Sequence, residues 1–146
     1  MIPLFVTNAL DGEPLPLYGD GRNVRDWLFV LDHCEAIDLV LRRGRDGEVY
    51  NVGGSHEVYN LTLTHEILRL TGRAADLIRP VKDRPGHDRR YSVDSSKVHA
   101  LGWRPRHRFT DALTSTVDWY RSHEAWWRPI KSGTFRAYYE RQYANR

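Results

Sequence analysis

A loop that mixes basic and turn-forming residues carries the strongest chemical signal in this sequence. It runs from Asp83 to Arg90 and places Arg84, His87 and Arg89 around a Pro-Gly turn. Such a turn exposes backbone N–H groups, while each arginine offers paired donors that match the oxygens of a diphosphate. The acidic residues of the loop argue against a plain nucleic-acid patch. The alternative is a solvated loop held by salt bridges, and composition alone leaves both interpretations open.

A second basic position follows a glycine turn nearer the N-terminus. In the string Asn23-Val-Arg-Asp-Trp27, Arg25 lies beside an aromatic residue and an acid. One interpretation is a further contact to the same kind of anion; the alternative is a guanidinium stacked on Trp27 and paired with Asp26. Of the 22 basic residues 19 are arginines. Because codon usage also explains such an excess, only arginines inside organised motifs are interpreted functionally.

Other kinds of active site are not supported by the pattern. The seven histidines show no pair four residues apart, so we expect no metal site. The single cysteine, Cys34, stands among acidic residues, which disfavour a thiolate, and we interpret it as a core or half-buried residue. Neither Gly-x-x-Gly-x-x-Gly nor Tyr-x-x-x-Lys occurs. We therefore expect no catalytic residue, and no cofactor bound by this chain alone.

The composition is that of a folded protein. Apolar residues make up 40% of the 146, charged residues 28%, and the formal net charge is +3, which excludes a disordered chain. No apolar run approaches the roughly 20 residues that span a bilayer, and the apolar stretch 2–10 lacks the basic flank of a signal peptide. A lone cysteine forbids an internal disulfide and indicates the cytoplasm.

The elements that must position these motifs alternate between helical and extended. The expected N-cap of the second helix is Asp32, and its expected apolar face is Ala36, Ile37, Val40 and Leu41. We predict one α/β domain over 1–146 whose strands do not complete a large parallel sheet. The expected helices cover 2–10, 32–44, 60–72, 95–101, 110–120 and 132–143, and the expected extended segments cover 14–18, 24–30, 48–54, 57–61, 77–81 and 91–94.

Several strings in this order resemble the dTDP-glucose 4,6-dehydratases, a branch of the extended short-chain dehydrogenase/reductases. They are Pro14-Leu-Pro-Leu-Tyr-Gly-Asp-Gly21, Asn23-Val-Arg-Asp-Trp27, Asp83-Arg-Pro-Gly-His-Asp-Arg-Arg-Tyr91 and Leu101-Gly-Trp-Arg-Pro105. The likeness covers nearly the whole chain but only the C-terminal two fifths of a family member. It implies the C-terminal substrate-binding lobe, without most of the Rossmann sheet or the N-terminal lobe that binds NAD and carries the catalytic groups.

The resemblance also implies site residues and a ligand, a dTDP-sugar. Pro16, Leu17 and Tyr18 would line the nucleobase, and Tyr143 would close over the nucleotide from the tail. Arg25 and Arg84 would hold the diphosphate. Ribose and phosphate would be held by the remaining group, which consists of Asn60, Asp83, Arg84, Pro85, Gly86 and His87.

Three hypotheses of function follow. The first is the sugar-nucleotide-binding part of such a dehydratase, inactive alone. The second is a non-catalytic partner that completes a separately encoded Rossmann half. The third, a small basic nucleic-acid-binding module, is disfavoured because acids are interspersed among the arginines. We expect no membrane partner. We expect self-association through apolar surface that would otherwise face the second lobe.

Overall fold

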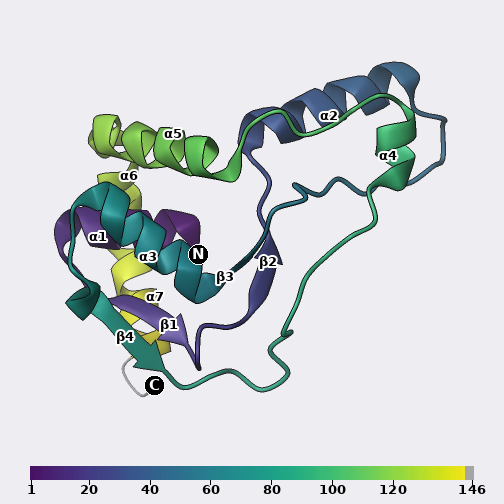
Figure 1. Cartoon of the computed structure of the whole chain (residues 1–146). Coiled ribbons are helices and arrows are strands. Elements are labelled where there is room, and N and C mark those ends of the chain that lie inside the picture. Colours follow the sequence, from purple (N-terminus) through teal and green to yellow (C-terminus); the bar gives the residue numbers. More distant parts are fainter. Residues whose placement is uncertain (144–146) are drawn as a thin grey trace.

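The computed structural model describes residues 1–143 as an α/β chain built around short parallel and antiparallel strand pairs (Figure 1). The strands are β1 (Leu15–Tyr18), β2 (Val24–Asp26), β3 (Glu57–Tyr59) and β4 (Ile78–Val81). The helices are α1 (Ile2–Asp11), α2 (Val30–Arg43), α3 (Asn60–Thr71), α4 (Ser96–Ala100), α5 (Phe109–Ser122), α6 (Glu124–Lys131) and α7 (Thr134–Tyr143), with a 3-10 turn, η1 (Ala75–Leu77), before β4.

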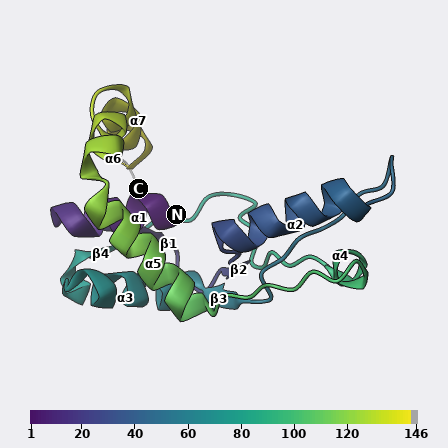
Figure 2. The same cartoon turned by 90° about the horizontal axis from the view of Figure 1, so that it is seen from above.

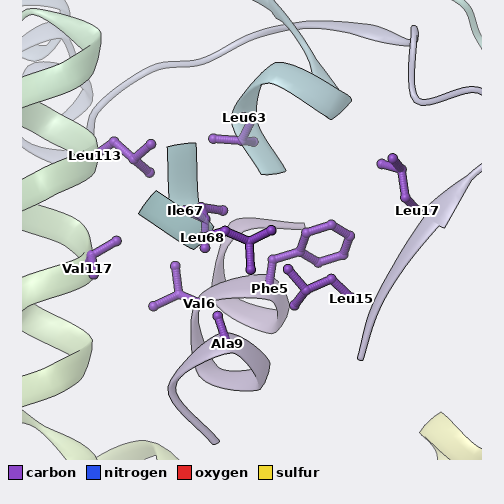
Figure 3. Packing of buried hydrophobic residues seen from close by; sticks show 10 residues of the cluster. All are labelled: Phe5, Val6, Ala9, Leu15, Leu17, Leu63, Ile67, Leu68, Leu113 and Val117. Carbon is purple, nitrogen blue, oxygen red and sulfur yellow. The ribbon is translucent and has the colours of Figure 1, made fainter. Parts of the chain in front are cut away.

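The main hydrophobic core lies between α1, α3, α5 and β1 (Figure 3). Its fully buried members include Val6 on α1, Leu63 and Ile67 on α3, and Val117 on α5. Leu63 and Ile67 recur at the four-residue spacing that places side chains on one helix face. α1 and α3 both end at a glycine in the left-handed conformation, Gly12 with φ 73° and Gly72 with φ 69°. The core thereby holds β1 rigidly against α1 and α3.

The sheet topology brings two distant loops together. β1 pairs with β4 in parallel, from Leu15 opposite Ile78 to Tyr18 opposite Val81. Because the carboxyl ends of parallel strands meet at one edge, the segments that follow Tyr18 and Val81 begin side by side. The amide of Gly19 donates to the carbonyl of Val81 (3.0 Å). The antiparallel pair β2–β3 lies next to them, and an isolated bridge joins Val24 to Arg90.

α2 and α4 form an arm that extends away from the main core (Figures 1 and 2). A second cluster of buried residues, Ala36, Val98 and Trp103, joins the two helices. Asp32, 1% exposed, fastens the arm, since its carboxylate accepts hydrogen bonds from the backbone amides of Arg106 and His107. In turn the indole N–H of Trp103 donates to the carbonyl of Asp32.

The arm differs from the sequence prediction. α2 begins at Val30, and Asp32 is not its N-cap because its carboxylate bonds to residues 106 and 107 instead. Of the expected apolar face only Ala36 is buried, whereas Ile37 and Leu41 are 55% and 84% exposed. Cys34 is exposed, so its expected burial was wrong.

The expected strand over 48–54 does not form within the described residues. The segment is held by single bonds, such as that from the Gly53 amide to the Ser95 hydroxyl (2.8 Å), and no described strand pairs with it. The expectation of one final helix over 132–143 was incomplete, since α6 precedes α7 and buries Trp127. No helix in the described part of the chain has the length and apolar character needed to cross a bilayer.

Candidate functional site

Strand β2 and the loop that follows β4 place a guanidinium, an imidazole and a carboxylate in one hydrogen-bonded row. The Nη2 atom of Arg25 lies 3.0 Å from Nε2 of His87, and Nδ1 of His87 lies 2.5 Å from the carboxylate of Asp83. Since arginine only donates and a carboxylate only accepts, the row assigns the neutral tautomer of His87, which donates from Nδ1 and accepts at Nε2. The hydrogen bond from His87 lowers the pKa of Asp83.

The guanidinium of Arg25 has four contacts, and none of them is with Asp26 or Trp27. It donates to the carbonyls of Val24 (2.6 Å) and Asp88 (3.0 Å), and its guanidinium lies 4.2 Å from the centre of the Tyr91 ring. Asp26 instead accepts from the His56 amide. The alternative predicted for Arg25, stacking on Trp27 and pairing with Asp26, is therefore not what the structure adopts. A guanidinium held in one orientation binds an anion with less loss of side-chain entropy.

The arginines of the 83–90 loop divide into two groups. Arg89 pairs with Asp20 (2.8 Å) and Arg90 with Glu57, so both tie the loop to neighbouring segments. Arg84 is exposed, and within residues 1–143 its side chain makes no hydrogen bond or ion pair. Asp88 raises the pKa of Tyr91, while Arg25 and Arg84 both act to lower it. The positive charges of Arg25 and Arg84 therefore act on the same region.

Aromatic rings gather around Tyr18 beside this row. The ring centroid of Tyr18 lies 5.7 Å from that of His87 and 6.2 Å from that of Tyr143, which comes from α7. Burial raises the pKa of Tyr143, and its hydrogen bond with Tyr18 acts in the same direction. Such a cluster presents ring faces suited to stacking on a planar group.

The other sequence-predicted residues fall into three settings. Pro16 and Leu17 are buried on β1, and the side chain of Leu17 belongs to the main core, so a ligand could reach only its main chain. Pro85 and Gly86 lie exposed at the tip of the loop, where Gly86 has φ 68°. Asn60 is 9% exposed at the start of α3.

Two asparagine side chains near the Arg25–His87–Asp83 row have oxygen atoms without a hydrogen-bond donor. The Oδ1 atoms of Asn60 and Asn23 are both buried and find no hydrogen-bond partner in the described structure. The segments touch, since the Asn60 amide donates to the Asn23 carbonyl (3.0 Å). Buried acceptors are normally satisfied, so these two favour a ligand that brings hydroxyl or N–H donors. Sequence reasoning missed Asn23, for which the only signal was its place two residues before Arg25.

The described residues show neither a glycine-rich turn between β3 and α3 nor a cluster of metal-ligating side chains. In this fold class the pyrophosphate of a dinucleotide rests on a glycine-rich turn between a strand and a helix, whereas β3 runs directly into α3 at Asn60 with no glycine between them. No group of three or more His, Cys, Asp or Glu side chains in residues 1–143 is placed to hold a metal ion. The row of Arg25, His87 and Asp83 offers hydrogen-bond donors that suit an anion, and the rings around Tyr18 offer faces that suit a planar group.

Comparison with known proteins identifies the family of the chain. The family model described as GDP-mannose 4,6 dehydratase matches residues 1–116. The chain is 54% identical over 133 residues to a dTDP-glucose 4,6-dehydratase of Streptomyces niveus, covering 90% of this chain and 40% of that enzyme. It is 42% identical to the dTDP-glucose 4,6-dehydratase of Salmonella typhimurium, covering 100% of this chain and 43% of that enzyme. The chain thus spans about two fifths of the length of these curated relatives.

Solved structures show the same relationship. DesIV, a dTDP-glucose 4,6-dehydratase from Streptomyces venezuelae solved with NAD and TYD bound, is 53% identical with a TM-score of 0.85, covering 89% of this chain and 41% of that one. A UDP-glucose 4-epimerase from Thermotoga maritima, solved with UDP-glucose, is 30% identical with a TM-score of 0.74, covering 83% of this chain and 39% of that one. The chain therefore belongs to the GDP-mannose 4,6 dehydratase family and matches a C-terminal portion of the dTDP-glucose 4,6-dehydratases.

Proposed function

We propose that residues 1–146 form the nucleotide-sugar-binding part of a dTDP-glucose 4,6-dehydratase and bind dTDP and dTDP-sugars without turning them over. The observation that carries this proposal is the convergence of Arg25, His87 and Tyr18 at the common edge of β1 and β4. In the proposed complex the base lies against Tyr18 and Tyr143, and the guanidiniums of Arg25 and Arg84 hold the diphosphate. Charge-assisted bonds to phosphate are about twice as strong as neutral ones.

The remaining site residues take supporting roles in this proposal. Asn60, and with it Asn23, accepts hydrogen bonds from the nucleotide through the free Oδ1 atoms. Asp83 holds His87 and thereby the guanidinium of Arg25, while Pro85 and Gly86 shape the loop and the main chain of Pro16 and Leu17 borders the base. NAD belongs to the portion of the family that this chain does not match. We assign no hydride or proton transfer to the residues described here.

The proposal is tested by calorimetric titration of the chain with dTDP. We expect binding with a dissociation constant on the order of 1 mM or tighter, which corresponds to about −4 kcal/mol. Thymidine, which lacks the diphosphate, should bind more weakly, and NAD should give no heat. UDP serves as the comparison for base specificity. The absence of dTDP binding at millimolar concentration would contradict the proposal, as would 4-keto-6-deoxy product formed by this chain alone.

A second candidate function rests on the exposed face of α2. Val30, Cys34, Ile37 and Leu41 follow one another at spacings of four, three and four residues, so they form a single stripe along the helix. All four are exposed, from 55% for Ile37 to 84% for Leu41 among the large apolar side chains. Next to the arm, segment 48–54 leaves its backbone unpaired by any described strand. These features suit a chain that completes a separately encoded Rossmann half.

Co-expression with the N-terminal portion of a dTDP-glucose 4,6-dehydratase tests this candidate. A stable complex on size exclusion would support it, and two separate elution peaks would exclude it. In either case we place the chain in the cytoplasm, where an exposed thiol such as Cys34 stays reduced. We propose no nucleic-acid partner, because Arg89 and Arg90 are already paired with carboxylates.

The same stripe predicts self-association of the isolated chain. Leu41→Glu places a charge at its most exposed apolar position and should shift the chain from oligomer to monomer in sedimentation velocity. Arg42→Glu is the matched control, since it introduces the same side chain on α2 outside the stripe and should leave the oligomer intact. A wild-type chain that sediments as a monomer at all concentrations would show that the stripe does not drive association.

A further inference from the structure

α7 is held in place by a few polar contacts rather than by burial in a core. None of its described side chains is fully buried, and Tyr138 is 55% exposed. Between α7, α6 and the end of α1 lies a cavity of about 520 Å³, bordered by Asn8, Trp127 and Tyr139 among others. Figure 2 shows α6 and α7 extending from the α1–α5 layer on the side away from α3. A helix in this setting depends on the contacts that cross the cavity.

The first of these contacts is the phenol of Tyr139. It accepts a hydrogen bond from Nδ2 of Asn8 (3.3 Å) and donates to the carbonyl of Pro14 (3.4 Å), while the same Nδ2 donates to Pro14 (2.7 Å). Asn8 is 1% exposed and belongs to α1, whose neighbours Val6 and Ala9 are core residues. Tyr139 therefore connects α7 to a rigid part of the fold.

The second contact lies where α7 begins. Lys131, the last residue of α6, forms ion pairs with Asp11 (2.6 Å) and Glu13 (2.9 Å), and its side chain is only 17% exposed. Ser132 and Gly133 then connect α6 to α7, and Gly133 adopts φ 66° with open space around it. Lys131 is therefore held in place immediately before Ser132 and Gly133, two residues whose backbone can change conformation.

The far end of α7 reaches the candidate site. Tyr139 lies 4.7 Å from Tyr143 between ring centroids, Tyr143 lies 6.2 Å from Tyr18, and Nε2 of Gln142 donates to the Tyr18 hydroxyl (3.3 Å). An unbroken series of contacts thus runs from Asn8 through Tyr139 and Tyr143 to Tyr18.

We propose that α7 is a closing segment over the ring of Tyr18, that it pivots at Ser132–Gly133, and that Tyr139, held by Asn8, is the positioning residue that sets Tyr143 against the bound base. This inference rests on the proposed nucleotide-binding function. Tyr139 itself touches no ligand. Lys131 fixes the base of the segment while its tip moves.

Hydrogen exchange and calorimetry on the whole chain test the proposal. In the absence of ligand, Tyr139→Phe should raise amide exchange across 134–143 by roughly 2- to 10-fold, because it removes the two long hydrogen bonds that the hydroxyl makes with Asn8 and Pro14. Tyr138→Phe is the matched control, a neighbouring phenol on the exposed side of the same helix. With dTDP, exchange across 134–143 should fall in the wild type. The dTDP affinity of Tyr139→Phe should fall by a similar factor, with that of Tyr138→Phe unchanged.

The outcomes separate the two claims. If the wild type gives no heat with dTDP, the proposed function fails and the closing role fails with it. If dTDP binds but leaves exchange of 134–143 unchanged, or binds Tyr139→Phe as tightly as the wild type, the closing role is wrong while the binding function stands. If Tyr139→Phe exchanges like the wild type without ligand, Tyr139 is not the anchor.

Discussion

Replacing Arg25 by alanine is expected to weaken dTDP binding by about 10- to 100-fold, the equivalent of one hydrogen bond or more to a charged group. The effect should be large because Arg25 is already oriented by His87, Asp88 and the Tyr91 ring, so little entropy is lost when it binds the diphosphate. Calorimetric titration with dTDP measures the loss. Arg25→Lys should restore only part of the affinity, since an ammonium cannot reproduce the planar fork of donors.

Arg89→Ala is the matched control for this prediction. Arg89 lies on the same loop system and carries the same charge, but its ion pair with Asp20 is exposed, with 58% of the Arg89 side chain accessible. Because its guanidinium is already paired with Asp20 and is not assigned to the diphosphate, Arg89→Ala should lower dTDP affinity by less than Arg25→Ala does. Equal losses in both variants would indicate a general electrostatic attraction rather than a bidentate grip. An Arg25→Ala chain that binds like the wild type would remove Arg25 from the site.

The helices of the main core were predictable because their side chains supply the whole signal. The residues of α3 that face α1 and α5 recur at helical spacing and end at Gly72, whose φ of 69° closes the helix. The 83–90 loop was predictable for a similar reason, since Pro85 and Gly86 force a turn wherever they occur. In both cases local chemistry decides the local structure.

The failures share a different cause. A strand exists only when another strand supplies hydrogen bonds, and nothing in residues 48–54 states where that partner is. The exposed stripe on α2 has the sequence pattern of a core helix. Amphipathic periodicity indicates that one face of a helix is apolar, but it does not identify the element that covers this face. Segment 48–54 and the α2 stripe are both surfaces that additional chain could cover, and the curated relatives are more than twice as long as this chain.

Only part of the candidate site could be predicted from the sequence, because the rest depends on contacts between residues that are far apart in the chain. Arg25 and the Asp83–Arg90 loop could be identified from their residue types, whereas Pro16, Asn60 and Tyr143 were expected through the resemblance alone. Asn23 was missed because its significance depends on an unpaired Oδ1 atom, which appears only when the fold buries it. The contact of Tyr139 with Asn8 joins residues 131 positions apart, and no local pattern encodes it.

Replacing Asp32 by alanine is expected to lower the free energy of unfolding by about 2–4 kcal/mol, because it leaves several donors around a buried position without their acceptor. The carboxylate accepts from Nδ1 of His107 (2.8 Å) and from the amides of Arg106 (3.1 Å) and His107 (3.3 Å). Urea unfolding followed by circular dichroism measures this loss of stability. Asp94→Ala is the matched control, since Asp94 is exposed and accepts from the Ser96 amide; it should lower the free energy of unfolding far less than Asp32→Ala does.

The same carboxylate predicts a pH dependence with a defined sign. Burial acts to raise the pKa of Asp32, but the hydrogen bonds from His107 and the two amides outweigh it, so the pKa in the folded chain is lowered. A lowered folded pKa means that the stabilisation is complete above the unfolded value of about 3.9 and is lost as the pH falls below it. The wild type and Asp32→Ala should therefore converge in stability as the pH falls below about 4. A difference that disappears well above that range would show that the carboxylate does not hold the arm as an anion, and the role of Asp32 in fastening α2 to residues 106 and 107 would have to be abandoned.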